Sequence, residues 1–226
     1  MPKNNLYFSY YNIPTDAVLK AYKDGLFPMA ETAESSEIYW VEPKKRGVFL
    51  FDKVKIPRKI KKIAKNNPFQ LSVDLQFPEV IENCSKLSST RKDTWINPAI
   101  KSIYIELFNK GHAHSIECYI DKKLVGGLYG VSIGKVFFGE SMFSLVSNAS
   151  KFALFHLFER LKWGGFDFID TQFINDHLLQ FGAQEIPNNI FKSMLKKGIS
   201  SEGDFFKYSP KGFIPKTLLP LKNNII

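Results

Sequence analysis

Residues 112–172 decide the fold, and they read HAHSIECYI (112–120), LVGGLYGV (124–131), VFFGESMF (136–143) and FDFIDTQ (166–172) around short turns and one helix. The first three segments are rich in β-branched and aromatic residues and predict an antiparallel meander. Asn148 caps a predicted helix over 148–162, which Gly164 and Gly165 end. Strand, helix and strand with short links imply a crossover, which makes the strands at 136–143 and 166–172 parallel neighbours.

The segments before this region predict a smaller unit of mixed structure. Thr15 is a candidate N-cap for a helix that runs to Asp24, and Asn97 followed by Pro98 is a candidate N-cap for a second helix. Strands are expected at 38–40, 47–51 and 69–73, and helices at 57–66 and after Pro78. The break after residue 66 predicts a small N-terminal domain over 1–66 and a larger domain over 67–226. The predicted fold class is therefore α+β.

Composition excludes several classes of protein. The chain has 226 residues, 44% of them hydrophobic, which rules out a disordered chain, and no run of apolar residues is long enough to cross a bilayer. The N-terminal residues do not resemble a signal peptide, so a cytoplasmic protein without a membrane partner is expected. Cys84 and Cys118 have no metal-binding or disulfide spacing and are expected to be reduced and packed.

The formal charge of +9 suggests a polyanionic partner. The cations concentrate early in the chain, at Lys44, Lys45, Arg46, Lys53, Lys55, Arg58, Lys59, Lys61, Lys62 and Lys65. A solvated lysine-rich surface would give the same pattern, so charge alone does not decide between the two interpretations.

Polar residues interrupt the two strands that are expected to be parallel. Glu140 lies on one strand, and Asp170 and Gln172 lie on the other. Because side chains alternate along a strand, Asp170 and Gln172 should share a face, as should Glu140 and Met142. Ligands gather at the carboxyl ends of parallel strands, so these residues are candidates for an active site. Simple pairing of the carboxylates with His112, His114 or lysines is the structural alternative.

Other reactive residues carry weaker signals. His112 and His114 alternate on one strand but lack a third ligand with suitable spacing, so no metal site is predicted. Cys118 has no recognisable catalytic partner, and Ser141 lies outside a nucleophile-elbow sequence.

At this point the motifs match a known family. The meander and crossover resemble the fold of the GCN5-related N-acetyltransferases. The whole pattern resembles the bacterial leucyl/phenylalanyl-tRNA–protein transferases over about residues 13–195. The matching blocks are FPM (27–29), WVEPKKR (40–46), TWI (94–96), GHAHSIE (111–117), LVGGLYGV (124–131), GESMFS (139–144), NASK (148–151) and IDTQ (169–172).

The resemblance implies an activity and a set of site residues. Such enzymes transfer Leu or Phe, with Met as a further candidate, from aminoacyl-tRNA to proteins that begin with Arg or Lys, which marks those proteins for degradation. It implies no metal, nucleotide or coenzyme, and a monomer is expected. The implied site residues form three groups: Leu128, Met142, Leu154, Leu157, Leu161 and Ile169 as the side-chain pocket, Trp95 at the aminoacyl-adenosine, and Glu140, Asp170 and Gln172 as the polar catalytic centre. With a tRNA substrate the basic surface gains a role, and the residues expected to contact phosphate are Lys44, Lys45, Arg46, Lys59 and Lys62.

Asp170, acting through Gln172 or a water, is the expected proton acceptor, and Glu140 is expected to attract the cationic side chain of the acceptor. Core packing is the alternative for each apolar residue of the pocket. The chain departs from the family at Met29, where a Trp is common. Two other functions compete: an acyl-CoA N-acyltransferase, whose strand-to-helix turn should be glycine-rich although residues 145–149 contain no glycine, and a non-catalytic tRNA-binding module.

Overall fold

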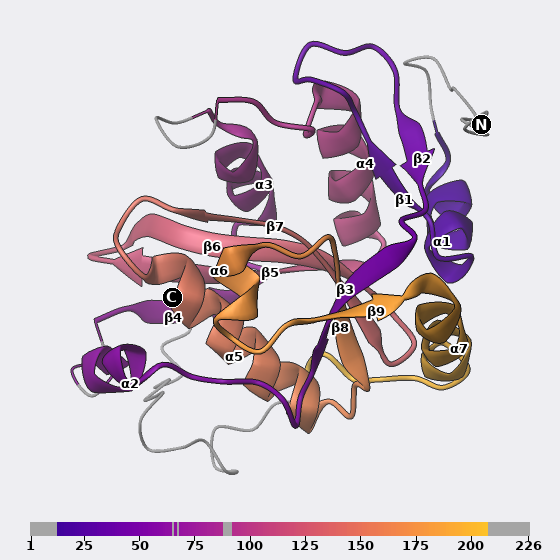
Figure 1. The fold of residues 1–226 in the computed structure, drawn as a ribbon. Helices are drawn as coiled ribbons and strands as arrows, with labels where there is room; N and C mark the ends of the chain where they lie inside the picture. The colour runs from indigo at the N-terminus through magenta and orange to yellow at the C-terminus, as the bar shows by residue number, and fades with distance from the viewer. Residues whose placement is uncertain (1–12, 65, 67, 88–91, 208–226) are drawn as a thin grey trace.

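The computed structural model describes residues 13–64, 66, 68–87 and 92–207 (Figure 1). Lys65 lies outside the described residues. The helices are α1 (Thr15–Lys23), α2 (Arg58–Ala64), α3 (Phe77–Ser85), α4 (Pro98–Asn109), α5 (Ala149–Trp163), α6 (Asp176–Leu179) and α7 (Asn188–Gly198). The strands are β1 (Phe27–Met29), β2 (Tyr39–Val41), β3 (Lys45–Leu50), β4 (Gln70–Val73), β5 (Ala113–Ile120), β6 (Lys123–Ile133), β7 (Val136–Ser144), β8 (Phe168–Gln172) and β9 (Gln184–Pro187). No helix in this part of the chain is long and apolar enough to cross a membrane.

One mixed sheet organises the described residues. Its strand order is β4-β5-β6-β7-β8-β3-β9, and β1 and β2 form a separate pair. The meander of β5, β6 and β7 is antiparallel, and β7 pairs with β8 in parallel, which confirms the predicted crossover through α5. Strand β3 lies between β8 and β9, so a segment before residue 66 belongs to this sheet. The domain boundary at residue 66 stays a prediction.

Helices cover both faces of the sheet. The first face packs against α1, α3, α4 and α7 through residues such as Val18, Ile100 and Phe191. The second face packs against α2 and α5 through residues such as Ile60 and Leu157. In Figure 1, α3 and α4 lie above the sheet and α5 lies below it. The sheet therefore separates two hydrophobic cores, and a ligand can reach both only where the sheet opens.

The sheet opens between β7 and β8. Their parallel pairing covers only Val136–Phe138 and Phe168–Asp170, whereas β7 continues to Ser144. At the same level a register shift separates Gly130, opposite Gly139, from the pair Tyr129 and Ser141. Glu140 is thus the extra residue of a β-bulge, which re-aims side chains along the strand. As a consequence Glu140 contacts residues of the first core while Met142 packs against the second, so the prediction that they share a face is wrong.

Helix caps and the C-terminal elements differ partly from the prediction. The side chain of Asn97 accepts from the Ile100 amide at 2.8 Å and caps α4 as predicted. In α1 the N-cap is Pro14, and Thr15 is the first helical residue. Asn148 precedes α5 with φ of 72° and no capping hydrogen bond from its side chain. The sequence pattern had indicated no element after residue 172, where α6, β9 and α7 follow.

The close approach at the bulge gives a test of the fold. A Cβ on Gly130 would lie 2.3 Å from the Phe138 carbonyl oxygen, whereas a Cβ on its partner Gly139 would meet nothing closer than 3.5 Å. Gly130→Ala should lower the free energy of unfolding by about 1–3 kcal/mol or more, because backbone has to move. Gly139→Ala should change it by less than about 1 kcal/mol. Urea unfolding of both variants measures this, and equal stabilities would contradict the described register.

Candidate active site

A cavity of about 810 Å³ lies at the opening between β7 and β8. Its apolar part is formed by the second core and includes five of the six predicted pocket residues. These are Leu128, Met142, Leu154, Leu157 and Ile169, joined by Phe49 from β3. Leu161, the sixth, is fully buried in the second core and does not line the cavity, so core packing is its role. The remaining walls include Met29 and Trp95 from the first core side.

Glu140 is the carboxylate of this cavity, and three side chains donate hydrogen bonds to it. The Tyr22 hydroxyl lies 2.7 Å from Oε1, and the Tyr104 hydroxyl lies 2.8 Å from Oε2. The two hydroxyls are themselves 2.6 Å apart. The Gln172 amide Nε2 donates to Oε1 at 3.0 Å. Residues from α1, α4 and β8 therefore meet at one carboxyl on the bulge of β7.

The surroundings of Glu140 change its acidity. Burial of the carboxyl raises the pKa of Glu140 to about 7, and the nearby negative charge of Asp170 acts in the same direction. The hydrogen bonds from Tyr22 and Tyr104 and the charge of Arg46 oppose this rise. Burial also raises the pKa of both tyrosine hydroxyls, so each keeps its proton at neutral pH. Perturbed groups of this kind in a cleft are typical of functional sites.

Asp170 does not line the cavity, because it forms a fully buried ion pair with Arg46. Arg46 Nε donates to Oδ1 at 2.8 Å and its second terminal nitrogen donates to Oδ2 at 2.6 Å. The third donor of the guanidinium bonds the Gly25 carbonyl at 2.9 Å. The guanidinium also lies over the rings of Phe27 and Phe191. Both charged side chains have 0% exposure. Asp170 is therefore not in a position to take a proton from a substrate.

Gln172 joins the ion pair to the cavity. Its backbone amide donates to Asp170 Oδ1 at 2.9 Å, and its side chain reaches Glu140 and lines the cavity. Asp170 and Gln172 are thus in direct contact, although of the two only Gln172 lines the cavity. Gln172 has φ of 57°, which costs about 1–3 kcal/mol for a residue other than glycine and persists only when the surroundings hold it. The Arg46–Asp170 pair supplies that constraint.

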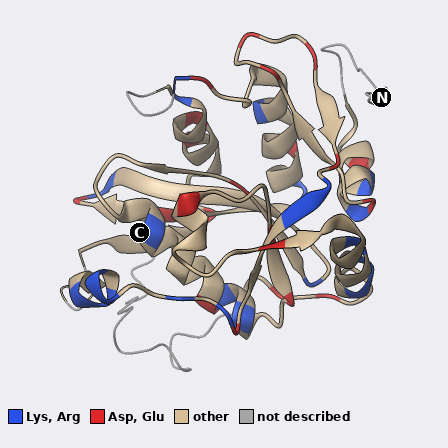
Figure 2. Ribbon diagram, viewed as in Figure 1, with Lys and Arg blue, Asp and Glu red and all other residues tan. Residues whose placement is uncertain are grey.

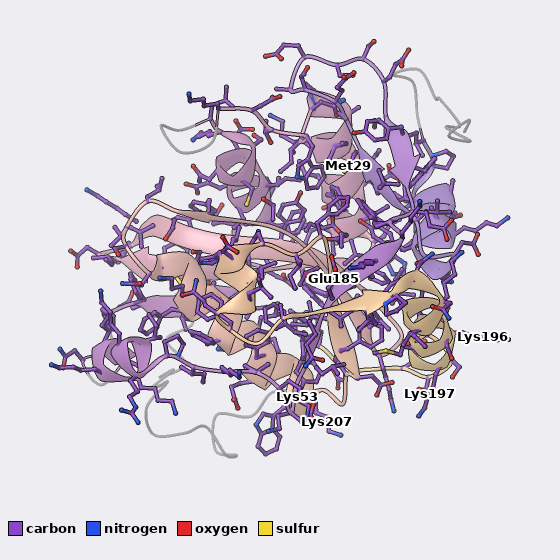
Figure 3. The ribbon with its side chains drawn as sticks, viewed as in Figure 1. Met29, Lys53, Glu185, Lys196, Lys197 and Lys207 are labelled. Carbon is purple, nitrogen blue, oxygen red and sulfur yellow. The ribbon has the colours of Figure 1, made fainter. Side chains whose placement is uncertain are left out.

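The other end of the cavity is aromatic and carries one cation. Trp95 is half-buried there, and the Ala30 amide next to Met29 bonds the Trp95 carbonyl at 3.4 Å. Figure 3 labels Met29 above the sheet, near α4. The predicted adenosine contact at Trp95 and the departure at Met29 therefore lie side by side. Lys86 from the segment after α3 also lines the cavity.

The predicted tRNA-contacting residues separate into three environments. Lys59 and Lys62 are exposed on α2, which carries four cations in seven residues. Lys44 and Lys45 precede and begin β3, where Lys45 pairs with Glu185 at 3.0 Å. Figure 2 shows α2 and the start of β3 as separate blue regions. Arg46 is buried in the ion pair, so the prediction that it contacts a phosphate is wrong.

His114 takes a structural position. His114 Nδ1 lies 2.7 Å from Asp74 Oδ2, and its ring stacks on Phe205. Neither Glu140 nor Asp170 pairs with it. Glu117, on the same strand, is buried and accepts hydrogen bonds from Ser72, Ser115 and the Gln76 amide.

Sequence reasoning missed Tyr22 and Tyr104 as site residues. The signal was available in part, because a buried tyrosine hydroxyl needs a polar partner. The partner could not be identified, since α1, α4 and β7 are far apart in the sequence.

Comparison with known proteins places this arrangement in a family. The model described as "Leucyl/phenylalanyl-tRNA protein transferase" matches residues 48–196, and the model of its N-terminal domain matches residues 12–44. A leucyl/phenylalanyl-tRNA–protein transferase of Zymomonas mobilis is 50% identical over 184 residues, which are 81% of this chain and 69% of the relative. One of Rhodopseudomonas palustris is 44% identical over 194 residues, which are 86% of this chain and 84% of the relative. The chain therefore belongs to the leucyl/phenylalanyl-tRNA–protein transferase family.

Proposed function

We propose that this protein transfers leucine or phenylalanine from aminoacyl-tRNA to the α-amine of proteins that begin with arginine or lysine. The new peptide bond marks those proteins for the degradation pathway that reads N-terminal residues. The observation that carries the proposal is that one cavity has both apolar walls and a polar part, which contains Glu140 and Gln172. An apolar end suits an uncharged side chain, and a carboxylate suits a cationic acceptor. The family supports the same activity.

A catalytic unit of the GCN5-related N-acetyltransferase kind fits the topology. Antiparallel strands β4 to β7 lead through α5 into β8, and β7 and β8 separate beyond their short parallel pairing. We propose a monomer as the working state, because residues of a single chain line the cavity. We propose the cytoplasm as the place of action, because charged tRNA is available there.

Acyl-CoA as the donor is disfavoured by the turn between β7 and α5. In that alternative, free backbone amides of the turn would grip a pyrophosphate. Here the amides of Leu145 and Val146 donate to the Val125 carbonyl at 2.8 and 3.2 Å, and the Ser150 amide donates to the Ser144 hydroxyl. A non-catalytic tRNA-binding module is disfavoured because it leaves the Glu140 network without a use.

The aminoacyl ester is already activated, so the chemistry needs a neutral amine held against the ester carbonyl. The pocket fixes the transferred side chain, and Trp95 and Met29 flank the adenosine end. Gln172 and Glu140 hold the amine. Asp170 acts as a positioning residue that keeps Gln172 in its strained conformation. No cofactor is needed for this transfer.

The activity and the pocket are tested together by single-turnover transfer to an Arg-initiated peptide. Phe-tRNA and Leu-tRNA should both react, whereas Val-tRNA should react about 10- to 100-fold more slowly, because small apolar differences are worth about 1–3 kcal/mol. A peptide that begins with Ala is the control and should not react. Equal rates with Val-tRNA and Leu-tRNA would contradict the pocket, and no transfer from either Leu-tRNA or Phe-tRNA would contradict the function.

Charged tRNA should bind through α2, and its affinity should fall steeply with salt. The double variant Lys59→Ala/Lys62→Ala should reduce the slope of log affinity against log salt concentration by about 2. The matched control is Lys196→Ala/Lys197→Ala, which removes two lysines from α7 on the opposite side of the molecule (Figure 3). Filter binding across a salt series measures both, and a reduced slope in the α7 variant alone would place the tRNA elsewhere.

Asp170→Asn tests the positioning role. It leaves the buried Arg46 guanidinium without a counter-charge, so the free energy of unfolding should fall by about 3–5 kcal/mol. At a temperature where the variant is folded, transfer should fall severalfold while Phe-tRNA binding stays close to wild type. The control is Lys45→Ala, which removes the exposed ion pair with Glu185 next to Arg46 on β3. It should lower the free energy of unfolding by less than about 1 kcal/mol. Unchanged transfer by Asp170→Asn would remove Asp170 from the mechanism.

A further inference from the structure

The cluster of Tyr22, Tyr104 and Glu140 has room for one more proton. Three oxygen-to-oxygen contacts connect the two hydroxyls and the carboxyl, at 2.6, 2.7 and 2.8 Å. Each hydroxyl has one proton, so an ionised Glu140 leaves two protons for three contacts. When both tyrosines donate to the carboxylate, their own short contact has no proton. One proton added to the carboxyl completes all three contacts.

The transfer reaction releases such a proton. An amine that attacks an ester carbonyl must lose one N–H proton, and Asp170 is enclosed with Arg46 outside the cavity. The titratable side chains that line the cavity are Glu140, His177, Lys86 and Tyr129. His177 lies on α6, where its ring packs edge-on against Phe181 with the ring centroids 5.0 Å apart. Glu140 is the carboxylate among them and is joined to Gln172.

Resting on the function proposed above, we propose that Glu140 is the general base of the transfer and that Tyr22 and Tyr104 are positioning residues that organise its carboxyl. The amine nitrogen forms a bond to the carbonyl carbon and passes one proton to Glu140. The ester C–O bond then breaks, and the ribose oxygen of the departing tRNA takes that proton. Glu140 ends ionised and ready for the next turnover.

The electrostatic surroundings agree with this role. A base is most effective when its pKa lies near the working pH, and burial raises the pKa of Glu140 to about 7. The charged groups that face it are Asp170 from β8, which raises this pKa, and Arg46 from β3, which lowers it. The hydroxyls of Tyr22 from α1 and Tyr104 from α4 also lower it, because they donate to the ionised form.

The pH dependence of single-turnover transfer, at saturating Phe-tRNA and Arg-initiated peptide, tests the proposal. Wild type requires both an ionised Glu140 and a neutral amine, so log rate should rise with a slope of about 2 below pH 7 and about 1 between pH 7 and the amine pKa. Glu140→Gln should lose at least about 100-fold in rate and keep a slope of about 1 throughout. A merely acceptor-binding Glu140 predicts a raised KM instead, with the maximal rate and slope unchanged, and that result would overturn the proposal.

The role of the tyrosines is tested by the pH at which the slope of log rate against pH changes from about 2 to about 1. Tyr104→Phe and Tyr22→Phe each remove a donor to the ionised carboxyl, so the midpoint near pH 7 should move to higher pH. The matched control is Tyr119→Phe, which removes a buried hydroxyl that donates to Glu117 at 3.3 Å in a separate network. Its midpoint should stay at the wild-type value. Unmoved midpoints in both site variants would overturn the positioning role.

His177→Gln addresses the remaining histidine of the cavity. It should keep the wild-type slopes, and a slope reduced to about 1 in this variant, but not in Glu140→Gln, would assign the base to His177. Melting curves confirm that each variant is folded at the assay temperature. If the wild-type protein shows no transfer at all, the proposed function is contradicted. If it is active and Glu140→Gln keeps the wild-type maximal rate and slope, only the role of Glu140 is contradicted.

Discussion

The bidentate contact between Arg46 and Asp170 is the interaction on which the candidate site depends. It joins β3 to β8, and a third hydrogen bond ties the same guanidinium to Gly25 after α1. Removing both charges from water costs several kcal/mol, which good geometry and full hydrogen bonding offset only partly. The pair is therefore weak as a source of stability. Its value lies in orientation, because only a restrained Asp170 can hold the Gln172 amide at its unfavourable φ.

A second constraint is the opening of the sheet. If β7 and β8 stayed paired beyond Phe138 and Asp170, the two cores would be sealed from each other. The bulge at Glu140 and the departure of β8 toward β3 separate the strands, so one cavity receives apolar walls from the α5 side and polar groups from the α1 and α4 side. A hydrophobic side chain and a reacting amine can thus be held next to each other without burying the charge among apolar residues.

Charge is divided between the surface and the interior. The lysines of α2 are exposed and face solvent, where an interaction with phosphate would be long-range and salt-dependent. Arg46, from the same basic stretch of sequence, is wholly buried and contacts two aromatic rings. The planar guanidinium suits that position, because it can stack and donate several hydrogen bonds at once. Neighbouring basic residues therefore have unrelated roles, which charge counting alone does not separate.

The meander, the crossover and the parallel pair followed from the sequence, because hydrophobic periodicity and short turns act locally. So did the α4 cap at Asn97. Five of the six predicted pocket residues line the cavity, and their contact with a substrate stays a prediction. Only the tertiary structure decided that Arg46 pairs with Asp170, that Leu161 is core, and that Tyr22 and Tyr104 meet at Glu140. Each of these contacts joins residues that are distant in the chain, and a buried charge or hydroxyl finds its partner only when the packed elements bring it there. The bulge at Glu140 belongs to the same class, because one extra residue in a strand reverses the faces that alternation predicts.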